Sequence, residues 1–162
     1  MTEKVRAAFV ENGILQEVHQ GDYITLPIFH RQTGRLLIIQ RGDDHEDFGI
    51  ARGDWDMVSE TAKENENLLL LCRRAILEEV ISKRHHLELF HYGGSLDPIS
   101  WNNGHKIHRA MFRYVGPPDT SLFSPREPDE ILNYKWVGFP DLLYLTARRK
   151  IAPFVLPFVM KF

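Results

Sequence analysis

The strongest pattern along the chain is a helical repeat of apolar residues over positions 67–83. Apolar side chains recur there at i, i+3, i+7 and i+11, which corresponds to about 100° per residue and to one buried stripe. The residues of this stripe are Leu69, Cys72, Ile76 and Val80. Leu68 and Leu71 widen the stripe. We therefore expect a helix over residues 67–83 that is covered on more than one side.

Shorter apolar runs predict strands before and after this helix. Residues 22–30 and 35–40 both have strand composition, and the polar turn 31–34 between them ends in glycine, which predicts a β-hairpin. The glycine-bearing segment 42–54 is expected to form a loop. Further strands are predicted over residues 87–92, 106–115 and 134–137. Residues 93–104 are predicted to form a loop or hairpin connection, and residues 117–128 a loop.

Both ends of the chain have helical segments as well. Residues 3–11 have helix-forming composition within an N-terminal extension, residues 1–19. Pro140 and Asp141 open a final helix that runs to residue 149, and the C-terminal part, residues 140–162, ends in an apolar tail. The predicted fold class is α+β, with a mixed β-sheet and two or three helices in a single domain over residues 1–162.

Composition and charge restrict the class of protein. With 162 residues, of which 43% are hydrophobic and 26% charged, the chain has the composition of one globular domain. The net charge of −2 gives no general attraction to nucleic acid, and no apolar run is long enough to cross a bilayer. We expect neither as a partner. Cys72 is the only cysteine, which excludes an internal disulfide and favours a cytoplasmic location.

The predicted helix over residues 67–83 also carries candidate chemistry. Ala75, Glu78 and Glu79 fall within about 100° of arc opposite the apolar stripe, so two carboxylates are expected to face outwards. Arg74 precedes Glu78 by one turn, a spacing that lets the two side chains pair. Adjacent carboxylates suit a hard cation such as Mg²⁺. The alternative is a solvated helix face with ordinary i,i+4 ion pairs.

The spacing of these residues resembles the Nudix box, G-x5-E-x7-R-E-U-x-E-E-x-G-U, in which U is a bulky aliphatic residue. The matching positions are Glu66, Arg74, Ile76, Glu78 and Glu79, with Trp55 five residues before the first box position, where the family commonly has tryptophan. The resemblance covers roughly residues 20–145. It implies a Nudix-like α/β/α sandwich, in which helices cover both faces of the mixed sheet.

The resemblance also implies a reaction, namely hydrolysis of a nucleoside diphosphate linked to another moiety by metal-activated water. Glu78 and Glu79 are the implied metal ligands, and together with Glu130 they are the implied catalytic residues. The implied cofactor is Mg²⁺ or Mn²⁺, as a single ion, and the implied ligand is a nucleotide or another diphosphate. The implied substrate-binding residues are Arg41, Trp55 and Arg74, and the candidates for stacking on a base are Phe48, Trp55 and Tyr134.

The chain departs from the family pattern at several positions. Ala75 stands where the family has a glutamate that binds metal or serves in catalysis, so we expect a weakened metal site. Glu60 and Ile81 stand at glycine positions, which predicts a changed loop over residues 55–66 and a helix that continues towards Lys83. Asn65 also replaces a glycine, but asparagine adopts the left-handed conformation readily.

Another carboxylate could fill the gap that Ala75 leaves. The acidic residues within reach are Glu60, Glu64, Glu66, Glu127, Asp129 and Glu130, of which Glu130 is the preferred additional ligand or base.

Other classes of function stay open beside the hydrolase. The chain could be a catalytically inactive Nudix fold that binds a nucleotide or a protein and needs no metal. In that case the apolar tail 151–162 either forms a homodimer interface or packs on its own domain. A zinc site at His105 and His108, or at His85 and His86, is disfavoured. If residues 105–108 form a strand, His105 and His108 lie on its opposite faces, and no cysteine assists either pair. An isopentenyl-diphosphate isomerase, which also has an arginine pair like Arg73 and Arg74, is set aside because its catalytic cysteine has no counterpart.

Overall fold

The structure is a computed structural model that describes residues 17–162. The helix predicted over residues 3–11 lies outside the described residues, as does most of the predicted extension over residues 1–19.

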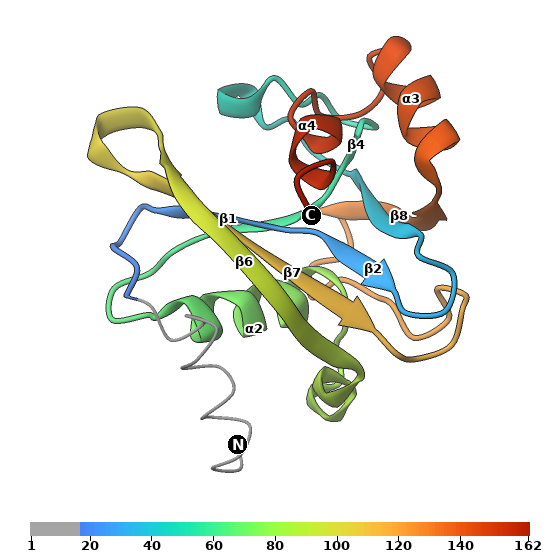
Figure 1. Cartoon of the computed structure of the whole chain (residues 1–162), viewed down its shortest axis with the longest axis horizontal. Helices are drawn as coiled ribbons and strands as arrows, with labels where there is room; N and C mark the ends of the chain where they lie inside the picture. Colours follow the sequence, from blue (N-terminus) through green and yellow to red (C-terminus); the bar gives the residue numbers. More distant parts are fainter. Residues whose placement is uncertain (1–16) are drawn as a thin grey trace.

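The centre of the fold is a mixed, eight-stranded sheet (Figure 1). Its main path runs in the order β4-β3-β2-β7-β1-β5, while β6 pairs with β7 and β8 pairs with β3. The β1 and β2 strands run parallel to β7, and the other pairings are antiparallel. The strands are β1 (Tyr23–Leu26), β2 (Ile28–His30), β3 (Leu36–Arg41), β4 (Trp55–Asp56), β5 (Val58–Thr61), β6 (Phe90–Ser100), β7 (Lys106–Tyr114) and β8 (Ile131–Val137).

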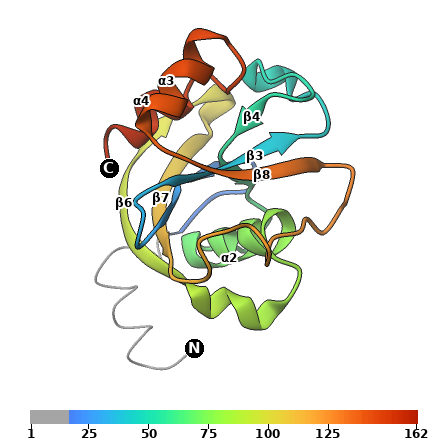
Figure 2. The same cartoon turned by 90° about the vertical axis from the view of Figure 1, so that its right-hand side faces the viewer.

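Helices lie on both faces of this sheet. Figures 1 and 2 show α2 (Leu68–Glu79) on one face and α3 (Phe139–Ala147) with α4 (Val155–Val159) on the other. Each face has its own cluster of buried apolar side chains, one beneath α2 and one beneath the C-terminal helices. The described residues also contain three short 3-10 helices: η1 (Glu46–Phe48), η2 (Arg84–Leu89) and η3 (Asn102–Gly104). The predicted α+β fold class is confirmed.

The first predicted hairpin is present, and its first strand is divided in two. Phe29 pairs with Leu36 across the turn in an antiparallel register. Pro27 separates β1 from β2, because proline has no N–H to donate to a ladder. Its carbonyl oxygen still accepts a bond from Phe112 N at 3.0 Å, so both strands stay on the same edge of β7.

The main helix begins where the sequence predicts and ends earlier. The Asn67 side chain caps it by accepting from Leu70 N at 2.9 Å. The predicted continuation towards Lys83 is wrong, since α2 ends at Glu79. Long-range donors cap its end instead of a glycine: Arg126 N donates to Glu78 O at 2.8 Å, and the Tyr134 hydroxyl donates to Glu79 O.

Of the two alternatives predicted for residues 93–104, a loop or a hairpin connection, the structure has the hairpin. β6 continues to Ser100 and pairs with β7, and only the 3-10 turn η3 separates the two strands. The register shifts between Tyr92 and Gly94 and again between Leu96 and Ile99, so the glycine pair and Pro98 are accommodated at bulges. β6 pairs only with β7, and an edge strand tolerates a proline.

The apolar C-terminal tail packs on its own domain. Ile151 bridges to Trp55 in parallel, and Ala152 N donates to Trp55 O at 2.8 Å, so the tail extends the sheet beside β4. Ile151, Ala152 and Val155, the last of which is the first residue of α4, are buried in the apolar cluster on the face of the sheet that α3 and α4 cover. Across residues 17–162, no helix has the length and apolar character needed to cross a membrane.

Candidate functional site

A cavity of about 670 Å³ opens between the end of β3, strand β5 and the end of α2. Its lining is mostly acidic. Among the described residues the lining contains seven carboxyl side chains, one arginine and one histidine. The acidic residues are Asp43, Asp44, Glu46, Glu60, Glu78, Glu79 and Glu130, and the others are Tyr23, Arg41, His45, Phe48, Ser59 and Thr61.

A close backbone approach brings two of these segments to the same rim. Gly42 N donates to Glu130 O at 2.8 Å, just before β8 begins. A Cβ atom at position 42 would clash with the carbonyl oxygen of Asp129, so the approach requires glycine. Gly42 therefore holds the acidic segment 43–46 beside Glu130.

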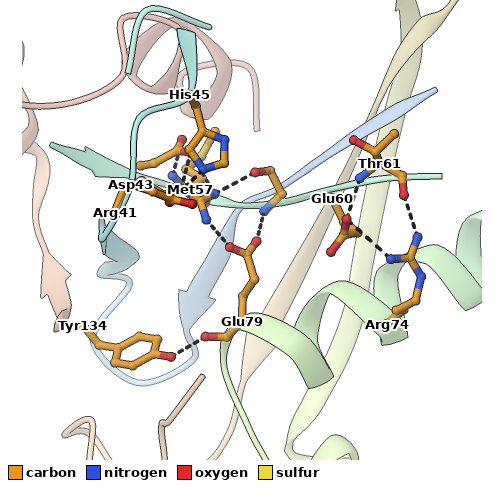
Figure 3. Close-up of polar contacts among 11 residues, drawn as sticks. Arg41, Asp43, His45, Met57, Glu60, Thr61, Arg74, Glu79 and Tyr134 are labelled. Carbon is orange, nitrogen blue, oxygen red and sulfur yellow. Dashed lines mark hydrogen bonds and ion pairs between the residues drawn. The ribbon is translucent and has the colours of Figure 1, made fainter. Parts of the chain in front are cut away.

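Arg41 is a buried member of the cavity lining, and each of its three guanidinium nitrogens donates at least one hydrogen bond. Its Nε and Nη2 atoms donate to Asp56 Oδ2 at 3.1 and 2.9 Å. Nη2 also contacts Met57 O at 3.3 Å and Ser59 Oγ at 2.8 Å, while Nη1 donates to the Glu79 carboxylate (Figure 3). Arg41 is thus a fixed counter-charge for two buried carboxylates.

Glu79 has both carboxylate oxygens engaged. Oε1 accepts from Ser59 N at 2.8 Å, and Oε2 accepts from Arg41 Nη1. The residue is 5% exposed. Burial raises the pKa of Glu79 to about 7, although the attraction of Arg41 opposes the shift.

Glu60 and Glu78 form a second pair of carboxyl groups, closer to solvent. Their side chains are in hydrogen-bonding contact, and Arg74 Nη1 lies 3.4 Å from Glu60 Oε1 and 3.6 Å from Glu78 Oε2. Burial and the neighbouring Glu78 carboxyl raise the pKa of Glu60 to about 7. Glu60 lies in β5, and the left-handed residue of the following loop is Asn65, with φ of 63°. Glu60 therefore contributes a carboxyl group to the cavity lining from β5.

Arg74 holds the loop between β5 and α2. Its Nε and Nη2 atoms donate to the two carboxylate oxygens of Glu66 at 2.9 and 2.8 Å, and Nη2 also donates to Thr61 O at 2.6 Å. The predicted pairing with Glu78 is present as the longer 3.6 Å ion pair. Arg74 itself does not line the cavity, but it pairs with Glu60 and Glu78, which do.

The helix face that was expected to point outwards is mostly covered. Ala75 is completely buried within the apolar cluster beneath α2, and Glu79 is buried against Arg41. The expected orientation is wrong for these two residues, because the helix is packed on two sides. Only Glu78, with a side chain 21% exposed, combines partial exposure with contact to the cavity.

The aromatic candidates occupy different places. Phe48 lines the cavity. Trp55 packs against the apolar cluster beneath α3 and α4, and the Tyr134 hydroxyl caps the end of α2. Of the residues expected at the site, the structure brings Arg41, Phe48, Glu78, Glu79 and Glu130 to the cavity and leaves Trp55, Arg74 and Tyr134 outside its lining. Tyr23, Ser59 and the acidic segment 43–46 were not anticipated, although the run Asp43-Asp44-His45-Glu46 after a strand was a visible signal.

Two of the histidines considered for zinc, His105 and His108, approach Asp22. His108 Nε2 is 2.8 Å from Asp22 Oδ2, and His105 Nδ1 is 3.6 Å from Asp22 Oδ1. Their expected separation onto opposite faces is wrong, because His105 precedes the first residue of β7. Within residues 17–162 no group of three or more histidine, cysteine, aspartate or glutamate side chains is arranged to hold a metal ion.

The NUDIX domain profile matches residues 21–159, and the chain therefore belongs to the NUDIX domain family. No curated protein sequence matches it.

Solved structures of similar proteins have the same fold. A NUDIX hydrolase from Nitrosomonas europaea aligns with a TM-score of 0.57 at 16% identity, over 83% of this chain and 65% of that chain. This chain therefore spans slightly less than two thirds of the length of that hydrolase. A Deinococcus radiodurans protein aligns with a TM-score of 0.59 at 18% identity, over 82% of this chain and 75% of that one. A Caenorhabditis elegans Ap4A hydrolase has a TM-score of 0.55 at 15% identity, over 78% and 86% of the two chains. Identities this low establish the common fold alone.

Proposed function

We propose that this protein hydrolyses a nucleoside diphosphate linked to another moiety, with a divalent cation between the phosphates and the acidic cavity. Membership of the NUDIX domain family and the acidic lining of the cavity support this proposal. The Ap4A hydrolase with the same fold acts on a ligand of this general class, a dinucleoside polyphosphate. We also propose a cytoplasmic location, which the single, buried Cys72 supports.

The charge of the cavity lining is the observation that carries the proposal. Seven carboxyl side chains surround the space, and the positive charge of Arg41 is already neutralised by Asp56 and Glu79. A diphosphate alone would be repelled by this lining. A divalent cation held by these carboxyl groups would offset that repulsion, because such ions take carboxylate and phosphate oxygens as ligands.

The residues present fit one cation better than a cluster of cations. Glu60 and Glu78 offer two adjacent carboxyl groups at the cavity that are partly exposed, even though both also pair with Arg74. Glu79 is instead buried against Arg41 and Ser59 N, and Ala75 has no donor. We propose that Glu60 and Glu78 hold the ion and that Glu60 compensates for the carboxylate missing at position 75. When bound, such an ion neutralises phosphate charge and acidifies water.

The chain's own residues then orient the reactants and accept a proton. An attacking water forms a new P–O bond, the P–O bond to the leaving phosphate breaks, and a carboxylate takes the water proton. We assign this proton to Glu130, which lines the cavity from its exposed rim. Glu79 and Arg41 act as positioning residues, since their contacts fix Ser59 and the end of α2. Arg74 positions Glu60 and Glu78, and Trp55 supports the scaffold rather than the substrate.

The test is turnover of a panel of dinucleoside polyphosphates, nucleotide sugars and nucleoside triphosphates with Mg²⁺ or Mn²⁺. Glu78→Gln should reduce turnover at least about a hundredfold, as expected when a positioned catalytic charge is lost. The matched control is Glu88→Gln, since Glu88 is exposed on η2 and does not line the cavity. Turnover that survives in Glu78→Gln, or absence of turnover with every substrate, contradicts the proposal.

A second function has one specific observation in its favour. The salt bridges of Arg41 occupy Glu79, a box carboxylate, and Ala75 removes another, which suits a Nudix domain that binds nucleotide without hydrolysis. Thermal stabilisation by a nucleotide, together with no turnover of the panel, would support this alternative.

A further inference from the structure

We infer that an apolar groove between the β2–β3 hairpin and the C-terminal helices binds an acidic segment of a partner protein, which inserts one large apolar side chain. The groove is separate from the acidic cavity, since the two linings share no residue among those that the structure describes. It lies on the face of the sheet that α3 and α4 cover, whereas α2, whose end borders the cavity, lies on the other face (Figure 2). The inference therefore goes beyond the proposed function and does not depend on it.

The lining of the groove is apolar throughout. The groove has a volume of about 160 Å³, and the described residues that line it are glycines and residues with apolar side chains. They belong to the hairpin, the end of β8, the start of α3 and the end of α4, and they include Phe29, Leu36, Val137, Phe139, Leu142 and Met160. Phe139 is 50% exposed and Met160 is 68% exposed, so apolar surface at the groove is left in contact with water. A partner that covers this surface gains hydrophobic stabilisation.

The concave shape of the groove requires the partner to supply the projecting side chain. An apolar cavity of about 150 Å³ holds a molecule of the size of benzene, so this groove has room for one aromatic or large aliphatic side chain. A lipid bilayer offers no such projection, because proteins bind bilayers by inserting their own apolar side chains into the lipid. The shape therefore favours a polypeptide partner over a membrane surface.

The exposed charges beside the groove are mostly positive. Arg31 and Arg35 flank the hairpin turn whose glycine lines the groove, and Lys161 directly follows the lining residues of the C-terminal segment. All three side chains are exposed, and none forms an ion pair with another side chain that the structure describes. Asp141 is the acidic residue in the first turn of α3, and its Oδ2 already accepts from Gly138 N at 3.0 Å. The groove is therefore bordered by unpaired cations in a chain whose net charge is −2.

These cations decide between two kinds of polypeptide partner. A second copy of this chain would bring two positively charged borders together across a symmetric interface, and like charges oppose such an association. A segment with carboxylates on either side of its apolar side chain would pair with the cations instead. The inserted side chain then supplies most of the affinity, and the charges fix the orientation of the segment and exclude basic partners.

The test follows the backbone amide signals of the isotope-labelled protein by NMR during titration with three synthetic peptides. The first peptide has one phenylalanine between two pairs of glutamates. The second has serine in place of the phenylalanine, and the third has lysines in place of the glutamates. The first peptide should shift the signals of groove residues such as Val137 and Leu142, and it should bind at least about tenfold more tightly than the other two.

One variant tests the apolar contact. Phe139→Ala should weaken binding of the first peptide on the order of tenfold, because the ring forms an exposed wall of the groove. Leu70→Ala is the matched control, since Leu70 is 46% exposed on α2 and does not line the groove. This control should bind the peptide as tightly as the wild type does.

A paired charge reversal tests the role of the cations. Arg35→Glu combined with Lys161→Glu should reverse the preference, so that the lysine peptide binds more tightly than the glutamate peptide. Lys83→Glu combined with Arg84→Glu is the matched control, since both residues are exposed at the start of η2, away from the groove lining. The control should keep the preference of the wild type.

Three outcomes overturn the inference. The first is no shift with the glutamate–phenylalanine peptide, or shifts confined to residues outside the groove. The second is a dimer in sedimentation velocity that Phe139→Ala separates, which would make a second copy the occupant. The third is co-sedimentation with phosphatidylserine vesicles that the paired charge reversal abolishes, which would make a membrane the partner. None of these measurements uses turnover, so failure of this inference leaves the proposed function standing, and the reverse holds as well.

Discussion

Arg41, at the end of β3, donates to the carboxylate of Glu79, which is 38 residues later at the end of α2. The same guanidinium makes two bonds to Asp56 Oδ2, at 2.9 and 3.1 Å. One buried cation therefore connects the sheet to the helix that carries the family motif. It occupies one carboxylate oxygen of Glu79, while Ser59 N donates to the other.

Arg41→Met should strongly destabilise the protein. The substitution leaves Asp56 and Glu79 buried without a counter-charge, which costs about 3–5 kcal/mol in comparable buried pairs. The free energy of unfolding can be measured by urea denaturation at pH 8. Arg35→Met is the control, since Arg35 is exposed in the turn before β3. A loss no larger than that of the control would show that Arg41 is not the structural cation described here.

The stability of the protein should fall as the pH rises from about 4.5 to 7. The pKa values of Glu60 and Glu79 rise from 4.5 to about 7 on folding, so the folded state binds more protons in this window. More protons on the folded state mean that the free energy of unfolding decreases with increasing pH, by up to about 1.4 kcal/mol per pH unit for each carboxyl group. Above pH 7 these two contributions are constant.

Glu60→Gln isolates one of these carboxyl groups. The variant should have a shallower decline between pH 4.5 and 7 and should be more stable than the wild type at pH 8, because the repulsion from Glu78 is removed. Urea denaturation over this pH range measures both quantities. A slope identical to that of the wild type would mean that the Glu60 carboxyl has its ordinary pKa in the folded protein.

Ala75→Glu should lower stability without improving the site. Ala75 is completely buried, and a carboxylate there would be desolvated among apolar side chains, at a cost on the order of 3 kcal/mol. Ala147→Glu, at an exposed position of α3, provides the comparison. If Ala75→Glu is as stable as the wild type and binds Mg²⁺ more tightly, the helix face is oriented differently from the arrangement described here.

Arg74 and Glu66 should be energetically coupled. Their side chains are 17% and 12% exposed and share two bonds in a fork, a geometry stronger than that of a surface ion pair. A double-mutant cycle with Arg74→Met and Glu66→Gln should give a coupling free energy of about 1–2 kcal/mol. Coupling near zero would mean that each residue acts through other contacts, such as the bond from Arg74 to Thr61 O.

The sequence predicts the local features of the fold well. The apolar repeat gives α2, the Asn67 cap marks its start, and the polar turn before β3 gives the hairpin. The end of α2 could not be predicted, because Arg126 and Tyr134 cap it from distant segments. The length of β6 beyond residue 92 was not predicted for a similar reason, since pairing with β7 overrides the local preference of Gly93, Gly94 and Pro98 for a loop.

The candidate site was predictable in its helix and less so in its surroundings. The box spacing identifies Glu78 and Glu79 directly. The sequence does not show that the Glu79 carboxylate pairs with Arg41. The two residues are 38 positions apart, and a local sequence pattern cannot predict a contact over that separation. Glu60 was one of several acidic residues within reach of the gap at Ala75. Only the fold brings it into contact with Glu78.

The most direct test of the central claim is calorimetric titration of Mn²⁺ into the wild-type protein, Glu60→Gln and Glu88→Gln at pH 8. If Glu60 and Glu78 hold the cation, the wild type and Glu88→Gln should bind one ion with the same affinity, and Glu60→Gln should bind it at least about tenfold more weakly. Equal affinity in all three proteins would place the ion elsewhere and contradict the claim.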